Sequence, residues 1–169
     1  MNMKNLQGCD FDNGSFIKTN GIEISAQGKF EMLQSSIYPD SYGVPCEYFF
    51  VIKIQLEGTP ELANEVELRK IHLKISDKSR NKTTNELQTV FVHIDRDLTE
   101  KNEDQPNQEE DLILRPNGKQ KEHNILLYVE NLGAKVTGYI EYKDLGDKNP
   151  ESENKKVNIK EFNLDLLKG

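Results

Sequence analysis

The clearest hydrophobic pattern in this chain runs from Glu47 to Glu57, where apolar side chains fall at every second position. Successive side chains of a β-strand point to opposite faces, so this alternation predicts a strand with one buried face. That face is expected to hold Tyr48, Phe50, Ile52, Ile54 and Leu56. The opposite face begins with Phe49 and Val51 and then turns polar, so the strand is expected to pass from a covered region into solvent.

Shorter stretches of the same alternation follow one another along the chain, with polar connections between them. The last of them, 157–167, fits either a strand or a helix, and we favour a strand because its neighbours are strands. The other expected strands lie at 22–27, 29–33, 66–75, 90–94, 112–115, 125–129 and 134–142, after an extended start near residue 15.

Local signals predict three features that interrupt this pattern. The Gln-Gly pair at 27–28 suits a tight turn. Thr59-Pro60 predicts the start of a short helix, because proline is favoured at the first helical position. The period of two slips at 69–70, which predicts a β-bulge that keeps the apolar side chains on one face.

Eight or nine short strands separated by polar turns predict an all-β fold. We expect an antiparallel β-sandwich of the immunoglobulin-like or jelly-roll-like kind, with little helix. A length of 169 residues suits one domain, which we place at 15–169 behind a flexible N-terminal arm, 1–14. Long loops are expected at 34–46, 95–111 and 143–156.

Composition limits the partners that the protein is expected to bind and the cellular location in which it is expected. The net charge of −7 argues against nonspecific binding to nucleic acid or anionic lipid, which needs clustered Lys and Arg. No apolar run approaches the roughly 18 residues of a membrane span, and none precedes Cys9 as a Sec signal would require. We therefore expect a soluble protein that is cytoplasmic or exported without a Sec signal. Cys9 and Cys46, which are the two cysteines, are expected to be free thiols.

The acidic excess is concentrated in residues 95–111, which hold eight acidic and two basic residues. Converging carboxylates are the ligands that Ca²⁺ prefers, so this segment is the candidate metal site. A solvated loop without a ligand is the favoured interpretation, because dense carboxylates without aromatic residues are usually exposed. No other cofactor is expected. The candidate ligands are Asp95, Asp97, Glu100 and Asp104.

The sequence holds no recognisable catalytic motif. Its three histidines, His72, His93 and His123, show neither HxH nor HExxH spacing, and each is expected at the surface or rim of the fold. A nucleophile elbow and a phosphate-binding glycine loop are also missing. We therefore do not expect an enzyme. The hydrolase alternative would require His93 or His123 beside a carboxylate and a nucleophile.

The candidate interaction residues lie where the central strand begins. Tyr38 and Tyr42 belong to the preceding loop, which is expected to cover Phe49 and Val51 as a lid. The predicted function is a non-enzymatic structural or protein-interaction module with another protein as partner. Such a module would suit a larger bacterial assembly, for example a secretion or phage-like machine. The alternative is a Ca²⁺-assisted module that binds a lipid head group or a carbohydrate through 95–111.

Overall fold

The computed structural model describes residues 14–34, 47–81, 83–99, 112–149 and 153–165, and these form nine strands with no helical element. The strands are β1 (Gly14–Thr19), β2 (Ile22–Gln34), β3 (Glu47–Gly58), β4 (Val66–Arg80), β5 (Leu87–Asp97), β6 (Ile113–Leu114), β7 (Lys121–Val129), β8 (Ala134–Asp144) and β9 (Lys155–Leu164). All the pairings are antiparallel. The predicted all-β fold is therefore confirmed.

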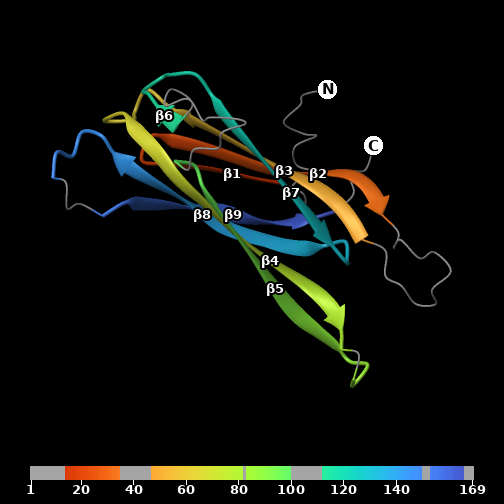
Figure 1. Ribbon diagram of the computed structural model, residues 1–169. Coiled ribbons are helices and arrows are strands. Elements are labelled where there is room, and N and C mark those ends of the chain that lie inside the picture. Colours follow the sequence, from red (N-terminus) through yellow and green to blue (C-terminus); the bar gives the residue numbers. More distant parts are fainter. Residues whose placement is uncertain (1–13, 35–46, 82, 100–111, 150–152, 166–169) are drawn as a thin grey trace, which may run out of the picture.

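Two sheets pack face to face (Figure 1). Sheet A has the strand order β1-β2-β3-β7, and sheet B has the order β5-β4-β8-β9, with β6 paired to the start of β4. Along one side of the sandwich β1 of sheet A lies against β9 of sheet B. The described strands thus form an antiparallel β-sandwich, as the strand pattern predicted.

The core is built from the inward faces of both sheets, and β3 is central to sheet A. Its residues Phe50, Ile52, Ile54 and Leu56 are at most 1% exposed, whereas Tyr48 is half-buried. In sheet B the corresponding central strand is β4, which buries Ile71, Leu73 and Ile75 on its inward side. Burying one aliphatic side chain stabilises a fold by about 1.5–3 kcal/mol, so these faces supply the main force that holds the sheets together.

The predicted β-bulge is confirmed. The register of β4 against β8 shifts between Leu68 and Lys70, so Leu68 and Ile71 both face the core although three positions separate them. The predicted strand in the tail is also confirmed, because β9 buries Val157 and Ile159 and pairs with β8.

The expected turn at 27–28 is wrong, because β2 runs through these residues and Gly28 pairs with Ile52. Alternation continues through the glycine, so the strand has no reason to end there. The turn lies instead at Asn20-Gly21, where both residues have positive φ, 54° and 82°. This is the backbone of a two-residue hairpin turn, for which Asn-Gly is the preferred pair. A Cβ on Gly21 would also meet the backbone of Leu62 at 2.4 Å.

The expected helix at Thr59-Pro60 is also wrong, because these residues form a turn. The Leu62 N–H donates to the Thr59 carbonyl at 3.0 Å, and the Glu61 N–H donates to the Thr59 hydroxyl at 3.2 Å. Thr59 itself donates through its N–H and its hydroxyl to the carbonyl of Gly21. The connection 59–65 has to enter β4 at once, and this leaves no room for a helix.

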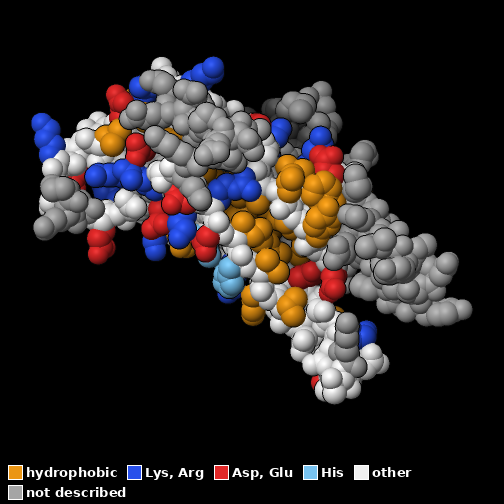
Figure 2. Space-filling view, in the orientation of Figure 1, with side chains coloured by type: hydrophobic (Ala, Val, Ile, Leu, Met, Phe, Trp, Pro, Cys, Tyr) orange, Lys and Arg blue, Asp and Glu red, His pale blue; other side chains and the backbone are white. Residues whose placement is uncertain are grey.

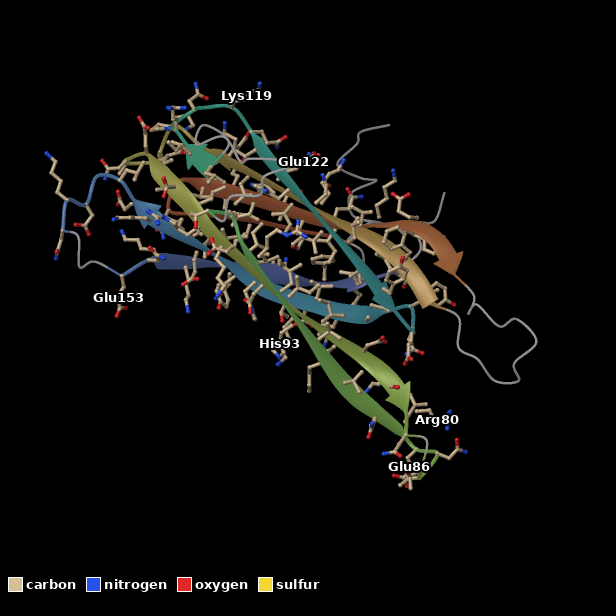
Figure 3. All side chains as sticks on the ribbon, viewed as in Figure 1. Arg80, Glu86, His93, Lys119, Glu122 and Glu153 are labelled. Atoms are coloured by element: carbon tan, nitrogen blue, oxygen red, sulfur yellow. The ribbon has the colours of Figure 1, made fainter. Side chains whose placement is uncertain are left out.

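The β4–β5 hairpin extends beyond the body of the sandwich (Figure 1). The pairing of β4 with β8 ends at Ser76, whereas its pairing with β5 continues to Arg80. Arg80 and Glu86 mark the tip of the projection (Figure 3). The last part of this hairpin therefore has a two-stranded structure.

Some predicted segments lie partly or wholly outside the residues that the structure describes, and two predicted loops have different bounds. The arm 1–14 lies outside them except for Gly14, which begins β1, and Cys9 and Cys46 lie outside them too. The loop expected at 95–111 begins later than predicted, because Asp95–Asp97 still belong to β5. The loop expected at 143–156 is shorter, since β8 ends at Asp144 and β9 begins at Lys155.

Candidate functional site

An apolar surface lies on the outer face of sheet A where β3 and β7 pair, and we call it the β3–β7 patch. Tyr128 pairs with Phe49, and Leu126 pairs with Val51, so these four side chains share one face of the sheet. The rings of Phe49 and Tyr128 stack at 4.8 Å between centroids with an interplanar angle of 24°. Leu126 is 61% exposed and Tyr128 is 50% exposed. The patch is thus a contiguous group of apolar side chains in contact with solvent (Figure 2).

The local sequence of β7 explains this exposure. All five residues from Ile125 to Val129 are apolar, so the strand carries apolar side chains on both faces. Ile125, Leu127 and Val129 are buried in the core, which leaves the two residues between them pointing outward. Because β7 is the edge strand of sheet A, no further strand among the described residues flanks them.

The same outer face turns polar further along β3 and β7. Gln55 donates to a carboxylate oxygen of Glu122 at 3.1 Å, and Lys53 lies 3.9 Å from the same carboxylate. The hydrogen bonds from Gln55 and Asn124 lower the pKa of the Glu122 carboxyl. The asymmetry predicted for the outer face of β3 is therefore present, and β7 repeats it across the pairing.

The structure brings two of the four predicted interaction residues together. Phe49 and Val51 lie on the outer face of β3, and both are half-buried. Their partners Leu126 and Tyr128 were not predicted, although the unbroken apolar run of β7 was a signal for them. Tyr38 and Tyr42 lie outside the described residues, so the lid stays a prediction.

A second group of interacting side chains lies on the outer face of sheet B, and we call it the β4–β5 cluster. Its centre is His72 of β4, whose Nδ1 lies 2.5 Å from Oδ1 of Asp95 on β5. Lys70 lies 3.7 Å from the same carboxylate oxygen. The hydrogen bond with His72, aided by the positive charge of Lys70, lowers the pKa of the Asp95 carboxyl.

Aromatic rings extend the cluster across three strands. The His72 ring stacks on Tyr139 of β8 at 4.8 Å, and the His93 ring lies 5.5 Å from His72. Lys156 lies 4.6 Å above the Tyr139 ring, and a similar contact joins Lys74 to Phe91 at 4.4 Å. Cations above aromatic faces are attracted by the ring quadrupole. Figure 3 shows His93 at the surface, near the point where the hairpin leaves the body.

The cluster refines the prediction for the histidines. The outward faces expected for His72 and His93 are confirmed, with His72 half-buried and His93 exposed. Their approach to each other was not predicted, because it depends on the register that sets His72 opposite Asp95. His123 lies on β7 in the other sheet, where it pairs with Ile54 of β3. The His72 ring contacts Asp95 and Tyr139 and lies beside the His93 ring, a group suited to charge pairing and stacking.

The metal site stays a prediction. The Asp97 carboxylate accepts hydrogen bonds from the Thr99 N–H at 2.9 Å and its hydroxyl at 2.6 Å, which lower the pKa of Asp97. Glu100 and Asp104 lie outside the described residues. Within the residues that the structure describes, no group of three or more His, Cys, Asp and Glu side chains is placed to hold a metal ion.

A shallow cavity of about 480 Å³ opens at one end of the sandwich. It lies where the Asn20-Gly21 turn, the 59–65 connection and the start of β9 meet. Lys155 and Asp144 form an ion pair of 3.5 Å in its wall. Leu62 and Val66 also line it, so the cavity has both polar and apolar walls above the end of the core.

No family model matches this sequence, and no curated protein sequence matches it either. Solved structures resemble the fold, among them two structural genomics targets. The Northeast Structural Genomics Consortium target SoR45 is 17% identical with a TM-score of 0.51, over 87% of this chain and 88% of its own. A Bordetella pertussis protein provisionally assigned as ApaA is 14% identical with a TM-score of 0.51, over 90% of this chain and 95% of its own. At these identities the likeness shows a common fold.

No helix among the described residues is both long enough and apolar enough to cross a membrane.

Proposed function

We propose that this chain is a non-enzymatic protein-interaction module that binds another protein through the β3–β7 patch. The exposure of Leu126 and Tyr128, at 61% and 50%, is the observation that carries the proposal. Contiguous apolar side chains on a protein surface are typical of interaction sites. The partner is expected to present an apolar surface that fits against these two side chains and the half-buried Phe49 and Val51 beside them.

Two further properties of the patch support protein binding. Tyr128 combines a large apolar ring with a hydroxyl, and tyrosine is among the residues that contribute most to binding energy in interfaces. The patch also lies on an edge strand, where a partner's extended segment can add main-chain hydrogen bonds to side-chain contacts. A component of a larger bacterial assembly, such as a secretion or phage-like machine, would use a surface of this kind.

The test compares partner recovery by variants of the patch. The double variant Leu126→Ser/Tyr128→Ser removes the two exposed side chains, whereas Phe16→Ser removes a phenylalanine that is 57% exposed on β1, the opposite edge of the same sheet. Cross-linked pull-downs from the native host, quantified by mass spectrometry, should recover a partner with the wild type and with Phe16→Ser. Recovery with the double variant should fall at least about tenfold.

The binding is then measured by calorimetry with the purified partner and each folded variant. Circular dichroism verifies that both variants keep the β-sandwich. Equal affinity of the double variant and the wild type would contradict the proposal.

A further inference from the structure

We propose that a second copy of this chain pairs with β5. The two β5 strands would run antiparallel about a twofold axis at Val92, and sheet B would continue from one copy into the other. This inference uses a different surface from the β3–β7 patch, and it does not depend on the proposed function.

The free edge of β5 is the first observation. Among the described residues β5 pairs with β4 alone, and it is the edge strand of sheet B. None of its eleven residues is buried, and large apolar side chains are exposed on both of its faces. Phe91 is 54% exposed on the outer face, and Val92 is 48% exposed on the inward side. Leu87 near the hairpin tip is 56% exposed.

The edge of β5 lacks the usual protection. Natural edge strands carry lysine or other charged residues, or proline, and these prevent pairing with another chain. From Leu87 to Ile94 this strand holds no Lys, Arg, Asp, Glu or Pro. The other edges differ: β9 carries Lys155, Lys156 and Lys160, and β1 has only six residues. On β7 the carbonyl of Asn124 already accepts a hydrogen bond of 2.8 Å from the guanidinium of Arg96, a residue of β5.

The charges of β5 favour a second copy in the antiparallel direction. All of them lie at one end, at Asp95, Arg96 and Asp97. Antiparallel pairing about Val92 overlaps the whole strand and sets that end against the uncharged residues 87–89 of the other copy. Parallel pairing in register would set each aspartate against its own copy, and like charges directly opposite each other destabilise a sheet.

The uncharged residues also match in this register. Val92 would pair with Val92 of the second copy, and Val90 with Ile94 on the same face. On the other face Phe91 would pair with His93. Apolar and aromatic cross-strand pairs of this kind stabilise antiparallel sheets, and a twofold axis makes the contact self-complementary and closed.

Within the part of the chain that the structure describes, the position of the hairpin leaves its β5 edge open to this contact. The end of the β4–β5 hairpin projects from the body (Figure 1), and hydrophobic side chains are visible along it (Figure 2). A strand-to-strand contact lies near the lower end of specific interface sizes, so we expect a dimer with Kd on the order of micromolar.

The first experiment is analytical ultracentrifugation of the full chain from about 1 to about 200 µM, a range that brackets such a Kd. The mass should rise from 19.4 kDa toward twice that value. Val92→Lys would set two lysines opposite each other and should stay monomeric, as should Phe91→Lys. Leu126→Lys on β7 is the matched control and should dimerise like the wild type. A wild type that is monomeric throughout would overturn the proposal.

The second experiment tests the axis itself. Val92→Lys and Val92→Asp should each be monomeric, and a mixture of the two should form a heterodimer, because the introduced charges then face each other with opposite sign. Circular dichroism identifies any variant that does not fold, and Phe91→Lys mixed with His93→Asp gives an independent pair, because residues 91 and 93 of the two copies would lie opposite each other on the outer face. A wild-type dimer that Val92→Lys and Phe91→Lys leave intact would overturn the assignment to β5.

The two proposals can fail separately. Leu126→Ser/Tyr128→Ser should keep the dimer and lose the other protein, whereas Val92→Lys should lose the dimer and keep the other protein. A variant of β5 that abolishes recovery of the other protein would show that the two surfaces are coupled and would overturn their independence.

Discussion

Asp77 is a buried carboxylate that connects the two sheets. It is 7% exposed at the end of the core-facing side of β4. One oxygen accepts hydrogen bonds from the Lys78 N–H and the Asn131 amide, and the other accepts from the Glu130 N–H. The connection from β7 to β8 crosses from sheet A to sheet B at this point, so Asp77 holds that crossing against β4.

Replacement of this residue tests its role. Asp77→Asn keeps the shape of the side chain but replaces one acceptor oxygen with an NH₂ group, which then faces one of the three N–H donors that bind Asp77. We therefore expect a loss of about 2–3 kcal/mol in the free energy of unfolding. Urea unfolding measures it. Glu153→Gln, at an exposed carboxylate, is the control and should change stability by less than about 0.5 kcal/mol. A loss of less than about 0.5 kcal/mol for Asp77→Asn would contradict the proposed role of Asp77 in holding the β7–β8 connection against β4.

Asp97 predicts a dependence of stability on acid. Its hydrogen bonds with Thr99 lower its pKa in the folded state below the ordinary value of 3.8. Its contribution is therefore fully present above that ordinary value and is lost as the pH falls through the lowered folded pKa. Asp97→Asn should be less stable than the wild type at neutral pH, and the difference should shrink below about pH 4. Urea midpoints across this range check it, and a difference that does not vary with pH would contradict it.

At the scale of elements, β4 organises sheet B. It is fifteen residues long and pairs with β5, β6 and β8. Its neighbour β8 has its own irregularity against β9, between Val136 and Gly138. Gly138 lies opposite Leu73, and a Cβ there would meet the His72 carbonyl oxygen at 2.2 Å. Close approach of the two backbones therefore requires glycine at this position.

The glycine can be tested directly. Gly138→Ala should force β8 away from β4 and destabilise the fold by about 1–3 kcal/mol, as overpacking usually does. Gly133→Asn is the control, because a Cβ at Gly133 would meet no atom within 4 Å, so the change adds only the cost of a φ of 88°, a conformation that asparagine adopts more readily than most residues other than glycine. Thermal unfolding followed by circular dichroism compares the two. Equal midpoints for Gly138→Ala and the wild type would show that the backbones can separate freely.

At the scale of the whole molecule, the two sheets are joined differently along their two sides. On one side β1 lies against β9. On the other side, Arg96 of β5 donates to the Asn124 carbonyl of β7, and beyond this contact the hairpin departs from sheet A. The surfaces of both proposals, the β3–β7 patch and the β5 edge, lie on strands of this second side.

Dimerisation through β5 predicts that stability depends on concentration. A partner that binds only the folded chain stabilises it by mass action. The thermal midpoint of the wild type should therefore rise as the chain concentration is raised through its Kd, whereas Val92→Lys should show one midpoint at all concentrations. Calorimetric scans of both proteins check this. A thermal midpoint of the wild type that does not change with concentration would contradict the coupling of dimerisation to stability.

Much of the fold could be predicted because alternation is a local property. The buried face of β3 and the bulge near Lys70 were readable from the spacing of apolar residues. The turn predicted at Gly28 and the helix predicted at Thr59-Pro60 are wrong, because the continuing alternation and the short connection outweigh single-residue signals.

The candidate sites could be predicted only in part. Phe49 and Val51 could be predicted because they are apolar on a face that turns polar, and this local asymmetry is present. Leu126 and Tyr128 join them through a pairing between strands far apart in the chain. Asp95 was assigned to an acidic loop, whereas its place in β5 brings it to His72.

The sequence by itself determined which side chains share a face of each strand, since the period of two follows from the backbone of a β-strand. It therefore determined the all-β class and most of the core. Only the tertiary structure decided which strands are neighbours, because antiparallel register is set by contacts between distant segments. That register places Leu126 beside Val51, joins His72 to Asp95, and leaves an uncharged stretch of β5 at the edge of its sheet.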